Sequence, residues 1–528
     1  MRQLSLWLLC PVVAYLLLFV WALLPQNALL SDGDIVMSHL APPKPCSAPS
    51  GGKYHNARSL LVDDILYISE ECKFYEIISI ENGNRHSTVH ATTHSIHQHA
   101  QGVVVSCEMA SATAAHDENE PHFDMWLFSL GKEKPNSLTI QQIEVKALQS
   151  RLTRKRQEEE ENDAVPRGNG LPSNPAMRTA DWRESNTVVL FIDALSHDDL
   201  PRLLPETAAY LAKLHAEQQQ NDWMHVIAFE NYNAVGGNSL PNQLALFTGM
   251  LHSHHWQILQ KEEALFSAVG TADDTLVPLF TLNNSQATSF YITDAYFQEP
   301  SSLDTIGSSV DYPFGLFGKI SKDVMQIPLF QSNRARCIGS GLDVVEATTS
   351  VLREFLRLKD RKARKKFAYW GTDSAHEASS SVIRNNDVTI ARTLQFLVEE
   401  THSLIFLLSD HGLSYGDNYQ KHWQARKGHR NPLLQLLVPS TVWKAKPEWK
   451  EALSFNSKRL VVATDVYQTF RDLASYWNSH RPPSQRSAPL IPTSQSLLHK
   501  ISADRTCEDL GIPDKFCLQS NPFKFVNS

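Results

Sequence analysis

A serine at the expected start of a helix is the residue of this 528-residue chain best placed for chemistry. Ser239 follows Gly236 and Gly237, which permit an unusual backbone at a turn. Pro241 suits a first helical position, and the apolar run 244–247 predicts a buried helix behind it. A hydroxyl there lies beside free backbone N–H groups and the positive end of the helix dipole, which favours an anion and a nucleophile in one place. The structural alternative is that Ser239 and the preceding asparagine only cap the helix.

Acidic residues follow three segments that are typical of buried strands. Asp193, Asp373 and Asp410 each come at or just beyond the end of an apolar run. His411 and Gly412 follow the last of them, and the glycine permits a turn that lets Asp410 and His411 face one ion. In a parallel sheet the residues beyond the carboxyl ends of the strands line the ligand crevice. The three runs are 187–192, 367–370 and 404–408.

Together, Asp193, Ser239, Asp410 and His411 offer the oxygen and nitrogen ligands that suit zinc or manganese. A divalent metal held by them would lower the pKa of the seryl hydroxyl or of a bound water. Each acidic residue also has a structural alternative, because an aspartate at a strand end can cap the next helix or hold a turn.

The helices between these runs decide how the strands are arranged. Helical patterns over 200–214 and 387–400 alternate with the strands. This alternation predicts an α/β fold, with a mostly parallel central sheet covered by helices on both faces. Short alternating runs between Cys46 and Val145 predict a small β-rich module before it.

The stretch from Ser239 to Gly249 resembles the nucleophile segment of the sulfatases, Cys-x-Pro-x-Arg followed by an apolar helix start that ends in Thr-Gly. Sulfatases need a Cys, rarely a Ser, that is oxidised to formylglycine, and they keep an Arg where this chain has Gln243. An unmodified Ser or Thr is carried by phosphatases and phosphotransferases of the same alkaline-phosphatase superfamily. The resemblance implies a metal-dependent hydrolase or transferase that acts on a phosphate-type ester through Ser239, with a sulfatase as the alternative.

The same resemblance assigns metal ligands. Asp-His-Gly at such a strand end supplies two ligands in the superfamily, which implies this role for Asp410 and His411, and Asp193 resembles the opening metal-binding aspartate.

Three further residues resemble the ligands of a second metal. Asp373 and His376 look like the second metal's pair, although the interval between them is one residue shorter than in the superfamily. His429 falls where the last histidine ligand would come. Each histidine could instead be a surface residue.

Beyond the superfamily, residues 186–440 resemble an uncharacterised sulfatase-like family of animal single-pass membrane proteins. That family implies the fold more firmly than a reaction, so a catalytically inactive membrane protein that retains the fold is a third possibility. The matching segments include 191–196, 232–238, 239–249, 336–339, 374–376 and 409–412.

Composition and charge bound the class of protein. A hydrophobic content of 42% over 528 residues is enough for one large core and a smaller domain. The formal net charge of -8 argues against a nucleic-acid partner, because a phosphate backbone requires a basic face.

An uncharged apolar run over 6–24 is about long enough to cross a bilayer. We expect an N-terminal membrane anchor or signal, with the rest of the chain lumenal or extracellular, or secreted if the segment is cleaved at a weak site near Ala22. Phosphorylated lipids, glycans or proteins are then plausible substrates. The expected parts are the anchor or signal 1–26, the β-rich module 27–147, a charged linker 148–180 and the alkaline-phosphatase-like or sulfatase-like domain 181–528 with its cysteine-containing tail.

Cysteine usage fits an oxidising compartment, because six cysteines remain outside the apolar run and no Cys-x-x-Cys pair suggests zinc. Fifteen pairings are open, and one of them, Cys507 with Cys517, would close a short loop near the C-terminus. A sequon at Asn283 predicts a glycoprotein.

Overall fold

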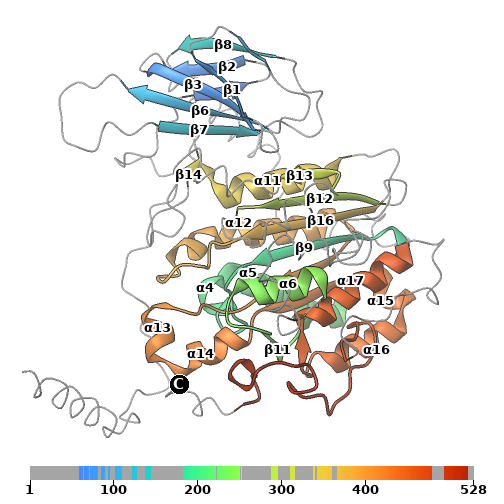
Figure 1. Cartoon of the computed structure of the whole chain (residues 1–528). Coiled ribbons are helices and arrows are strands. Elements are labelled where there is room, and N and C mark those ends of the chain that lie inside the picture. The colour runs from blue at the N-terminus through green and yellow to red at the C-terminus, as the bar shows by residue number, and fades with distance from the viewer. Residues whose placement is uncertain are drawn as a thin grey trace, which may run out of the picture. The chain divides into compact units, whose positions relative to one another are not determined.

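The computed structural model describes strands between residues 59 and 143 and a longer α/β region (Figure 1). The apolar run 6–24, the linker 148–180 and the sequon at Asn283 lie outside the described residues. No helix within the described part of the chain is both long and apolar enough to span a membrane. The described α/β region comprises residues 182–221, 223–249, 251, 287–294, 310–314, 337–338, 342–358, 365–477 and 493–520.

The N-terminal strands form two four-stranded sheets, with the strand orders β1-β2-β8-β5 and β4-β3-β6-β7. Alternating apolar residues make them strands, and Leu66, Ile68 and Ile77 are fully buried. The strands are β1 (Ser59–Val62), β2 (Ile65–Ser69), β3 (Cys72–Ile80), β4 (Arg85–Val89), β5 (Thr93–Ser95), β6 (Gly102–Met109), β7 (His122–Leu127) and β8 (Ser137–Ile143).

A seven-stranded sheet in the order β10-β18-β17-β9-β16-β12-β13 is the centre of the α/β region. Strands β17, β9, β16, β12 and β13 run parallel, and β18 is antiparallel to both of its neighbours. The predicted mostly parallel sheet is therefore confirmed. The strands are β9 (Asn186–Ile192), β10 (Met224–Ala228), β12 (Ala287–Thr293), β13 (Tyr312–Phe314), β16 (Lys365–Thr372), β17 (Ser403–Leu408) and β18 (Leu434–Pro439).

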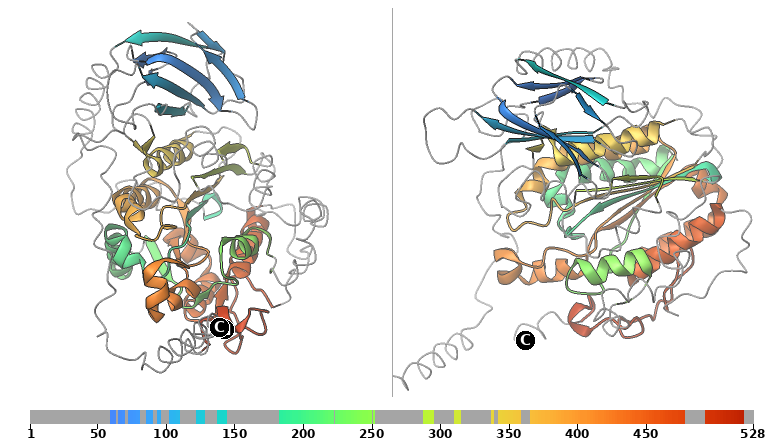
Figure 2. Two further views of the ribbon diagram at one scale, coloured as in Figure 1. Left: turned by 60° about the vertical axis from the view of Figure 1, so that its left-hand side comes forward. Right: turned by 45° about the horizontal axis from the view of Figure 1, so that its top comes forward.

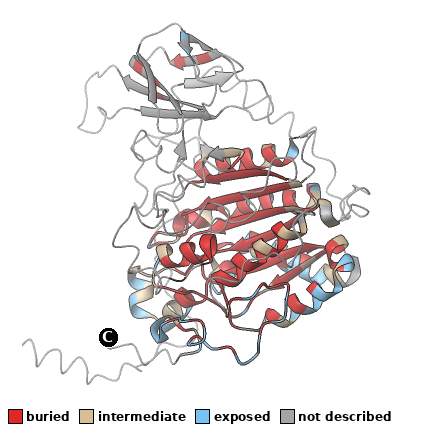
Figure 3. Ribbon diagram, turned by 45° about the vertical axis from the view of Figure 1, so that its right-hand side comes forward, coloured by how far each residue is buried: buried red, intermediate tan, exposed pale blue. Residues whose placement is uncertain are grey.

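Helices cover both faces of this sheet, as predicted (Figure 2). One face carries α4 (Leu200–Leu203), α5 (Pro205–Asn221), α11 (Val344–Arg357) and α12 (Ser381–Glu400). The other carries α6 (Ser239–Thr248) and α17 (Ala463–Trp477). The sheet and the inner sides of these helices are buried (Figure 3).

Two predicted helices differ from the structure in their bounds. The helix expected over 200–214 is broken into α4 and α5, because Pro205 starts a new helix instead of continuing the first. The helix expected from residue 387 begins six residues earlier, at Ser381, where Glu377 accepts hydrogen bonds from the backbone N–H groups of Ser381 and Val382. A proline sets the first boundary and a local capping carboxylate the second, and the apolar period reveals neither.

The remaining described elements are short strands and helices outside the central sheet. The short strands β11 (Tyr232–Asn233) and β19 (Val461–Val462) pair in parallel, and β14 (Cys337–Ile338) pairs with β15 (Leu342–Asp343). A disulfide joins Cys507 and Cys517, whose Cα atoms are 5.9 Å apart, so this predicted pairing is confirmed. The helices of this part are α13 (Gly416–Lys421), α14 (Trp423–Arg430), α15 (Ser440–Ala445), α16 (Pro447–Asn456) and the short η1 (Trp182–Glu184) and η5 (Asp514–Phe516).

Buried aromatic rings hold the register of the sheet beneath the strand ends. Tyr369 of β16 stacks on Phe191 of β9 and on Tyr291 of β12, with ring centroids 5.8 and 5.1 Å apart. Such contacts make a register slip costly, because a slip by one residue would turn every ring to the other face. The residues that follow the three strands are thereby fixed relative to one another.

Candidate active site at the carboxyl ends of the strands

Buried aspartates follow neighbouring strands of the central sheet. Ile192 pairs with Thr372, and Phe191 pairs with Leu408, so β9, β16 and β17 end side by side. Asp193, Asp373 and Asp410 follow these ends and are at most 7% exposed. The structure thus brings the three predicted aspartates to one edge of the sheet.

The turn after β9 is tied to the turn after β17 by its backbone. Ala194 has a φ of 62°, a left-handed conformation that is uncommon for a residue with a side chain. Its N–H donates to Oδ1 of Asp410 at 3.3 Å, and the N–H of Leu195 donates to Oγ of Ser409 at 3.0 Å. This strained residue therefore sets the distance between Asp193 and Asp410, as strained residues at functional sites often do.

Ser239 is the first residue of α6, and its side chain points into the cluster. Its Oγ lies 3.0 Å from Nε2 of His411 and 3.3 and 3.4 Å from the two carboxylate oxygens of Asp193. Asn238 is the N-cap residue, but its side chain forms no capping hydrogen bond. The arrangement departs from the alternative in which Asn238 and Ser239 serve only as caps.

The glycines near Ser239 and Asp410 are required by close packing and not by an unusual backbone. A positive φ is absent from Gly236, Gly237 and Gly412. The expectation that these glycines permit an unusual backbone was therefore wrong. A Cβ on Gly236 would lie 2.4 Å from the Pro241 ring, and one on Gly412 would lie 2.5 Å from the carbonyl oxygen of Gly428. A side chain at either place would force the two segments apart.

His411 presents one ring nitrogen to the cluster. Its Nδ1 lies 2.7 Å from the carbonyl oxygen of Gly412 and must donate to it, so Nε2 is the ring nitrogen that faces the cluster. Nε2 is 3.8 Å from Oδ1 of Asp193 and 3.7 Å from Oδ2 of Asp410. The imidazole is thus oriented as metal-binding histidines are, with the second nitrogen held by a carbonyl.

His376 joins the same cluster despite its shortened interval from Asp373. Ligand atoms of Asp193, His376 and His411 all lie within 4.8 Å of one another. The N–H of His376 donates to the carbonyl oxygen of Asp373 at 2.8 Å, which makes a tight turn at the end of β16. This turn carries both residues to the site.

His429 is buried beside the cluster. Its ring centroid is 5.6 Å from that of His411, but its Nε2 lies 3.2 Å from the carbonyl oxygen of Gly237. Burial and the neighbouring His411 lower the pKa of His429 to about 4, so its ring is neutral at pH 7. In this geometry His429 contacts the turn before Ser239, and its role as a metal ligand stays a prediction.

The carboxylates of the cluster perturb one another. Burial, and then the charges of Asp410 and Asp373, raise the pKa of Asp193 well above its ordinary value. Burial also acts to raise the pKa of Asp410, but His411, Gln243 and backbone N–H groups hold it below its ordinary value. Among the described residues no Lys or Arg forms an ion pair with Asp193 or Asp410. His411 is the one basic side chain that the described residues place against both carboxylates, so a bound cation would stabilise this buried acidic cluster, and the donor set fits a divalent metal.

Sequence reasoning missed two residues that support this site. Asp294 follows β12, and its carboxylate accepts from the N–H of Asp373 at 3.0 Å and from the hydroxyl of Thr372 at 2.8 Å. The sequence pattern that identified the other aspartates also marks Asp294, because 287–293 is a β-branched and aromatic run followed by an acidic residue. Tyr415 had no such signal, and its hydroxyl donates to the carbonyl oxygen of His376 at 2.6 Å.

Gln243, which stands where the sulfatase pattern has an arginine, also belongs to the site. Its Nε2 donates to Oδ2 of Asp410 at 3.2 Å. An amide in this place orients the carboxylate without neutralising it.

A family model described as "Protein of unknown function (DUF229)" matches residues 69–276 and 315–528. The chain belongs to this family. None of the curated proteins matches it in sequence.

Solved structures with similar arrangements include several enzymes. The C-terminal periplasmic domain of EcEptC from Escherichia coli, in complex with zinc, is 12% identical over 65% of this chain and 91% of that one, with a TM-score of 0.38. The phosphonate monoester hydrolase SpPMH from Silicibacter pomeroyi is 13% identical over 61% and 78%, with a TM-score of 0.35. BT4656, in complex with its substrate D-glucosamine-2-N,6-O-disulfate, is 12% identical over 61% and 82%, with a TM-score of 0.35. At scores this low a shared activity does not follow.

Proposed function

We propose that this protein is a metal-dependent hydrolase or transferase that acts on a phosphate-type ester, with Ser239 as the nucleophile. The observation that carries the proposal is the contact of the Ser239 hydroxyl with both His411 and Asp193 inside a buried cluster of carboxylates. If Ser239 were only a helix cap, or His411 only a surface residue, their side chains would not need to be in contact.

Asp193, Ser239, Asp410 and His411 would hold the metal, zinc or manganese, with Asp373, His376 and His429 as further candidates. The ligand atoms of Ser239, Asp193 and Asp410 lie 3.0 to 3.8 Å from the neighbours measured above, close to the separations expected around a tetrahedral ion, about 3.3 to 3.6 Å for bonds of about 2.0 to 2.2 Å. When bound, such an ion supplies positive charge that favours ionisation of the hydroxyl and neutralises charge on the ester oxygens.

In the proposed first step Ser239 Oγ attacks phosphorus after its proton has passed to solvent. The Oγ–P bond forms as the bond from phosphorus to the leaving oxygen breaks, and that oxygen takes up a proton. Backbone N–H groups in the first turn of α6 stabilise charge that develops on the phosphoryl oxygens. Water or an acceptor hydroxyl then attacks phosphorus, which breaks the Oγ–P bond and returns Ser239 to its hydroxyl form.

The test is Ser239→Ala in the full chain, with aryl phosphate monoesters, aryl phosphate diesters and aryl sulfates as probe substrates. We expect turnover to be abolished while the metal content, measured by elemental analysis at saturating metal, is unchanged, because Asp193, Asp410 and His411 would still hold the ion. Ser239→Thr keeps the hydroxyl and is the matched control that should retain measurable turnover. Full activity in Ser239→Ala would refute the assignment.

Two measurements on the parent protein separate the alternatives. A sulfatase would show formylglycine at residue 239 by mass spectrometry of the peptide, whereas the proposal expects an unmodified or phosphorylated serine. An inactive protein that retains the fold need hold no stoichiometric metal.

We also propose that the site faces the lumen or the cell exterior, on a chain attached to the membrane through 6–24. The disulfide between Cys507 and Cys517 supports this placement, because such bonds persist in oxidising compartments. Phosphorylated lipids, glycans and proteins are the substrate classes that this placement favours.

A further inference from the structure

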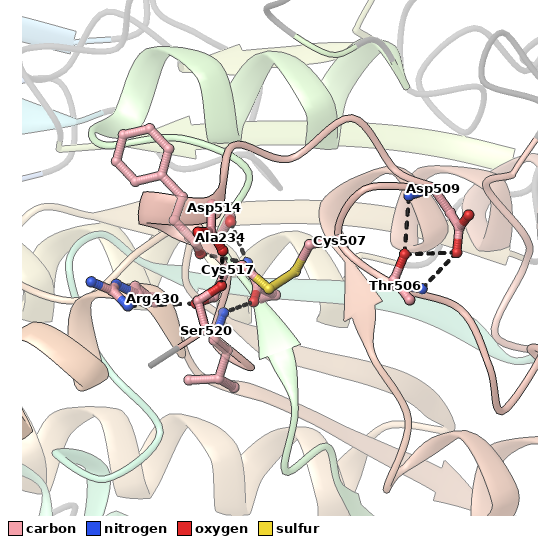
Figure 4. Close-up of a disulfide and its surroundings, with 11 residues drawn as sticks. Ala234, Arg430, Thr506, Cys507, Asp509, Asp514, Cys517 and Ser520 are labelled. Atoms are coloured by element: carbon pink, nitrogen blue, oxygen red, sulfur yellow. Dashed lines mark hydrogen bonds between the residues drawn. A yellow bond between two sulfur atoms is a disulfide. The ribbon is translucent and has the colours of Figure 1, made fainter. Parts of the chain in front are cut away.

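The turn that precedes Ser239 lies against the C-terminal segment. This turn, residues 233–238, meets residues 507–518, which the disulfide Cys507–Cys517 closes into a loop (Figure 4). More than 260 positions of sequence separate the two segments. The segment 507–518 is called the C-terminal loop below.

Asn233 forms the first connection. Its side chain is fully buried, and its Nδ2 donates to the carbonyl oxygen of Phe516 at 2.9 Å. Its Oδ1 accepts from the N–H of Leu518 at 2.6 Å. The amide therefore uses both of its ends to hold the backbone on either side of Cys517.

Phe516 forms the second connection. Its half-buried ring packs so closely on Gly237 that a Cβ there would lie 3.0 Å from ring atoms Cε1 and Cζ. On its other side the carbonyl oxygen of Gly237 contacts Nε2 of His429. Gly237 is thus held between an aromatic ring and a buried imidazole.

Arg430 forms the third connection (Figure 4). Its carbonyl oxygen accepts from the N–H of Ala234 at 2.9 Å, and its Nη1 lies 3.5 Å from the carbonyl oxygen of Cys517. Arg430 thereby bridges the turn, which its backbone contacts, and Cys517, which its side chain contacts.

Asn242 of α6 also holds the turn. Its Oδ1 accepts from the N–H groups of Val235 and Gly236, and its Nδ2 donates to the carbonyl oxygens of Gly236 and Asn238. These bonds fix the shape of the turn, but they move with α6 and do not place the turn relative to the sheet. Contacts from outside α6 place it: those of the C-terminal loop, the backbone bond from Ala234 to Arg430, and the pairing of β11 with β19.

We propose that Asn233 and Phe516 are positioning residues, through which the C-terminal loop holds the turn that presents Ser239 to Asp193 and His411. The effect on turnover rests on the proposed function; the effect on the turn does not. A displacement of about 1 Å at a nucleophile can reduce turnover about 100-fold. A few weakened contacts on this turn can therefore affect the rate without unfolding the sheet.

The experiment compares Phe516→Ala with Phe455→Ala, both in the full chain. Phe455 is a matched control, because it is also half-buried but lies on α16, where its ring contacts Arg459 and Lys500. The first readout is deuterium uptake of the peptide 232–240. The second is the separation of kcat from KM with 4-nitrophenyl phosphate, and metal content is measured alongside.

For Phe516→Ala we expect faster uptake confined to 232–240, a kcat lower by about 10- to 100-fold, and a KM and metal content within about twofold of the parent. Phe455→Ala should change none of these. A Cys507→Ser/Cys517→Ser double variant should reproduce the effect of Phe516→Ala, and Glu508→Ala, an exposed change in the same loop, should not. If Phe516→Ala does not fold, Phe516→Leu takes its place.

Unchanged uptake over 232–240 would overturn the proposal, whatever the activity. An unchanged kcat despite faster uptake would overturn it as well. If the parent shows no turnover that depends on Ser239, the proposed function fails, and uptake alone then decides whether the loop positions the turn.

Discussion

Replacing Tyr415 with phenylalanine tests whether this residue prepares His376 for a metal. The hydroxyl of Tyr415 donates to the carbonyl oxygen of His376 at 2.6 Å and lies 3.2 Å from Nδ1 of the same residue. Because its only proton goes to the carbonyl, the oxygen can accept from Nδ1–H, which leaves Nε2 for the cluster. Tyr415→Phe removes both bonds and keeps the ring that packs on His376, with centroids 5.3 Å apart.

The size of the effect follows from the role of such supporting bonds. Loss of a group that orients a metal-binding histidine usually lowers metal affinity by about 10- to 100-fold, or about 1.4 to 2.7 kcal/mol. The metal-free protein loses the same two hydrogen bonds at a half-buried place, which costs about 1 to 3 kcal/mol of unfolding free energy. Metal affinity is therefore compared between folded proteins, so that a loss of stability is not mistaken for a loss of affinity.

The assay is competition for zinc against a chromophoric chelator, with thermal unfolding of the metal-free protein measured in parallel. Tyr419→Phe is the matched control, because Tyr419 lies one turn further along and contacts His429 through its ring, 5.4 Å between centroids. No hydrogen bond from the Tyr419 hydroxyl is seen within the described residues. Zinc affinity of Tyr415→Phe within twofold of the parent, in a folded protein, would show that the hydroxyl does not prepare His376.

Two further predictions concern stability. The pKa of His429 is about 4 in the fold against 6.5 for a free histidine, so the unfolded chain binds a proton that the folded protein does not. As the pH decreases from 6.5 to 4, the free energy of unfolding of the metal-free parent should therefore fall by about 3 kcal/mol more than that of His429→Gln. If the unfolding free energies of the two proteins depend on pH in the same way, this prediction is wrong. Lys366, which is 6% exposed, caps the end of α11: its Nζ donates to the carbonyl oxygens of Phe355, Leu356 and Leu358. Lys366→Met should therefore lower the free energy of unfolding by about 2 to 4 kcal/mol, measured by chemical denaturation. A loss under about 0.5 kcal/mol would show that these bonds do not stabilise the helix end.

Much of the architecture could be predicted because its signals are local. Runs such as 188–192 and 404–408 are apolar at every position, which is typical of strands buried on both faces. An aspartate at the end of such a run must lie at the carboxyl edge of the sheet, and so Asp193 and Asp410 could be placed without coordinates. Helix bounds were less certain, since Pro205 and Glu377 act through contacts that periodicity does not contain.

The sequence by itself determined the parallel sheet, the aspartates at its edge and the serine at a helix start, because each depends on the order of neighbouring residues. Only the tertiary structure decided that Ser239 Oγ lies 3.0 Å from Nε2 of His411. It also decided that residue 237 has no room for a side chain beneath Phe516, and that Tyr415 supports His376. These contacts join residues 39 to 279 positions apart, and the distance between such residues is set by packing of the whole chain and not by local preference.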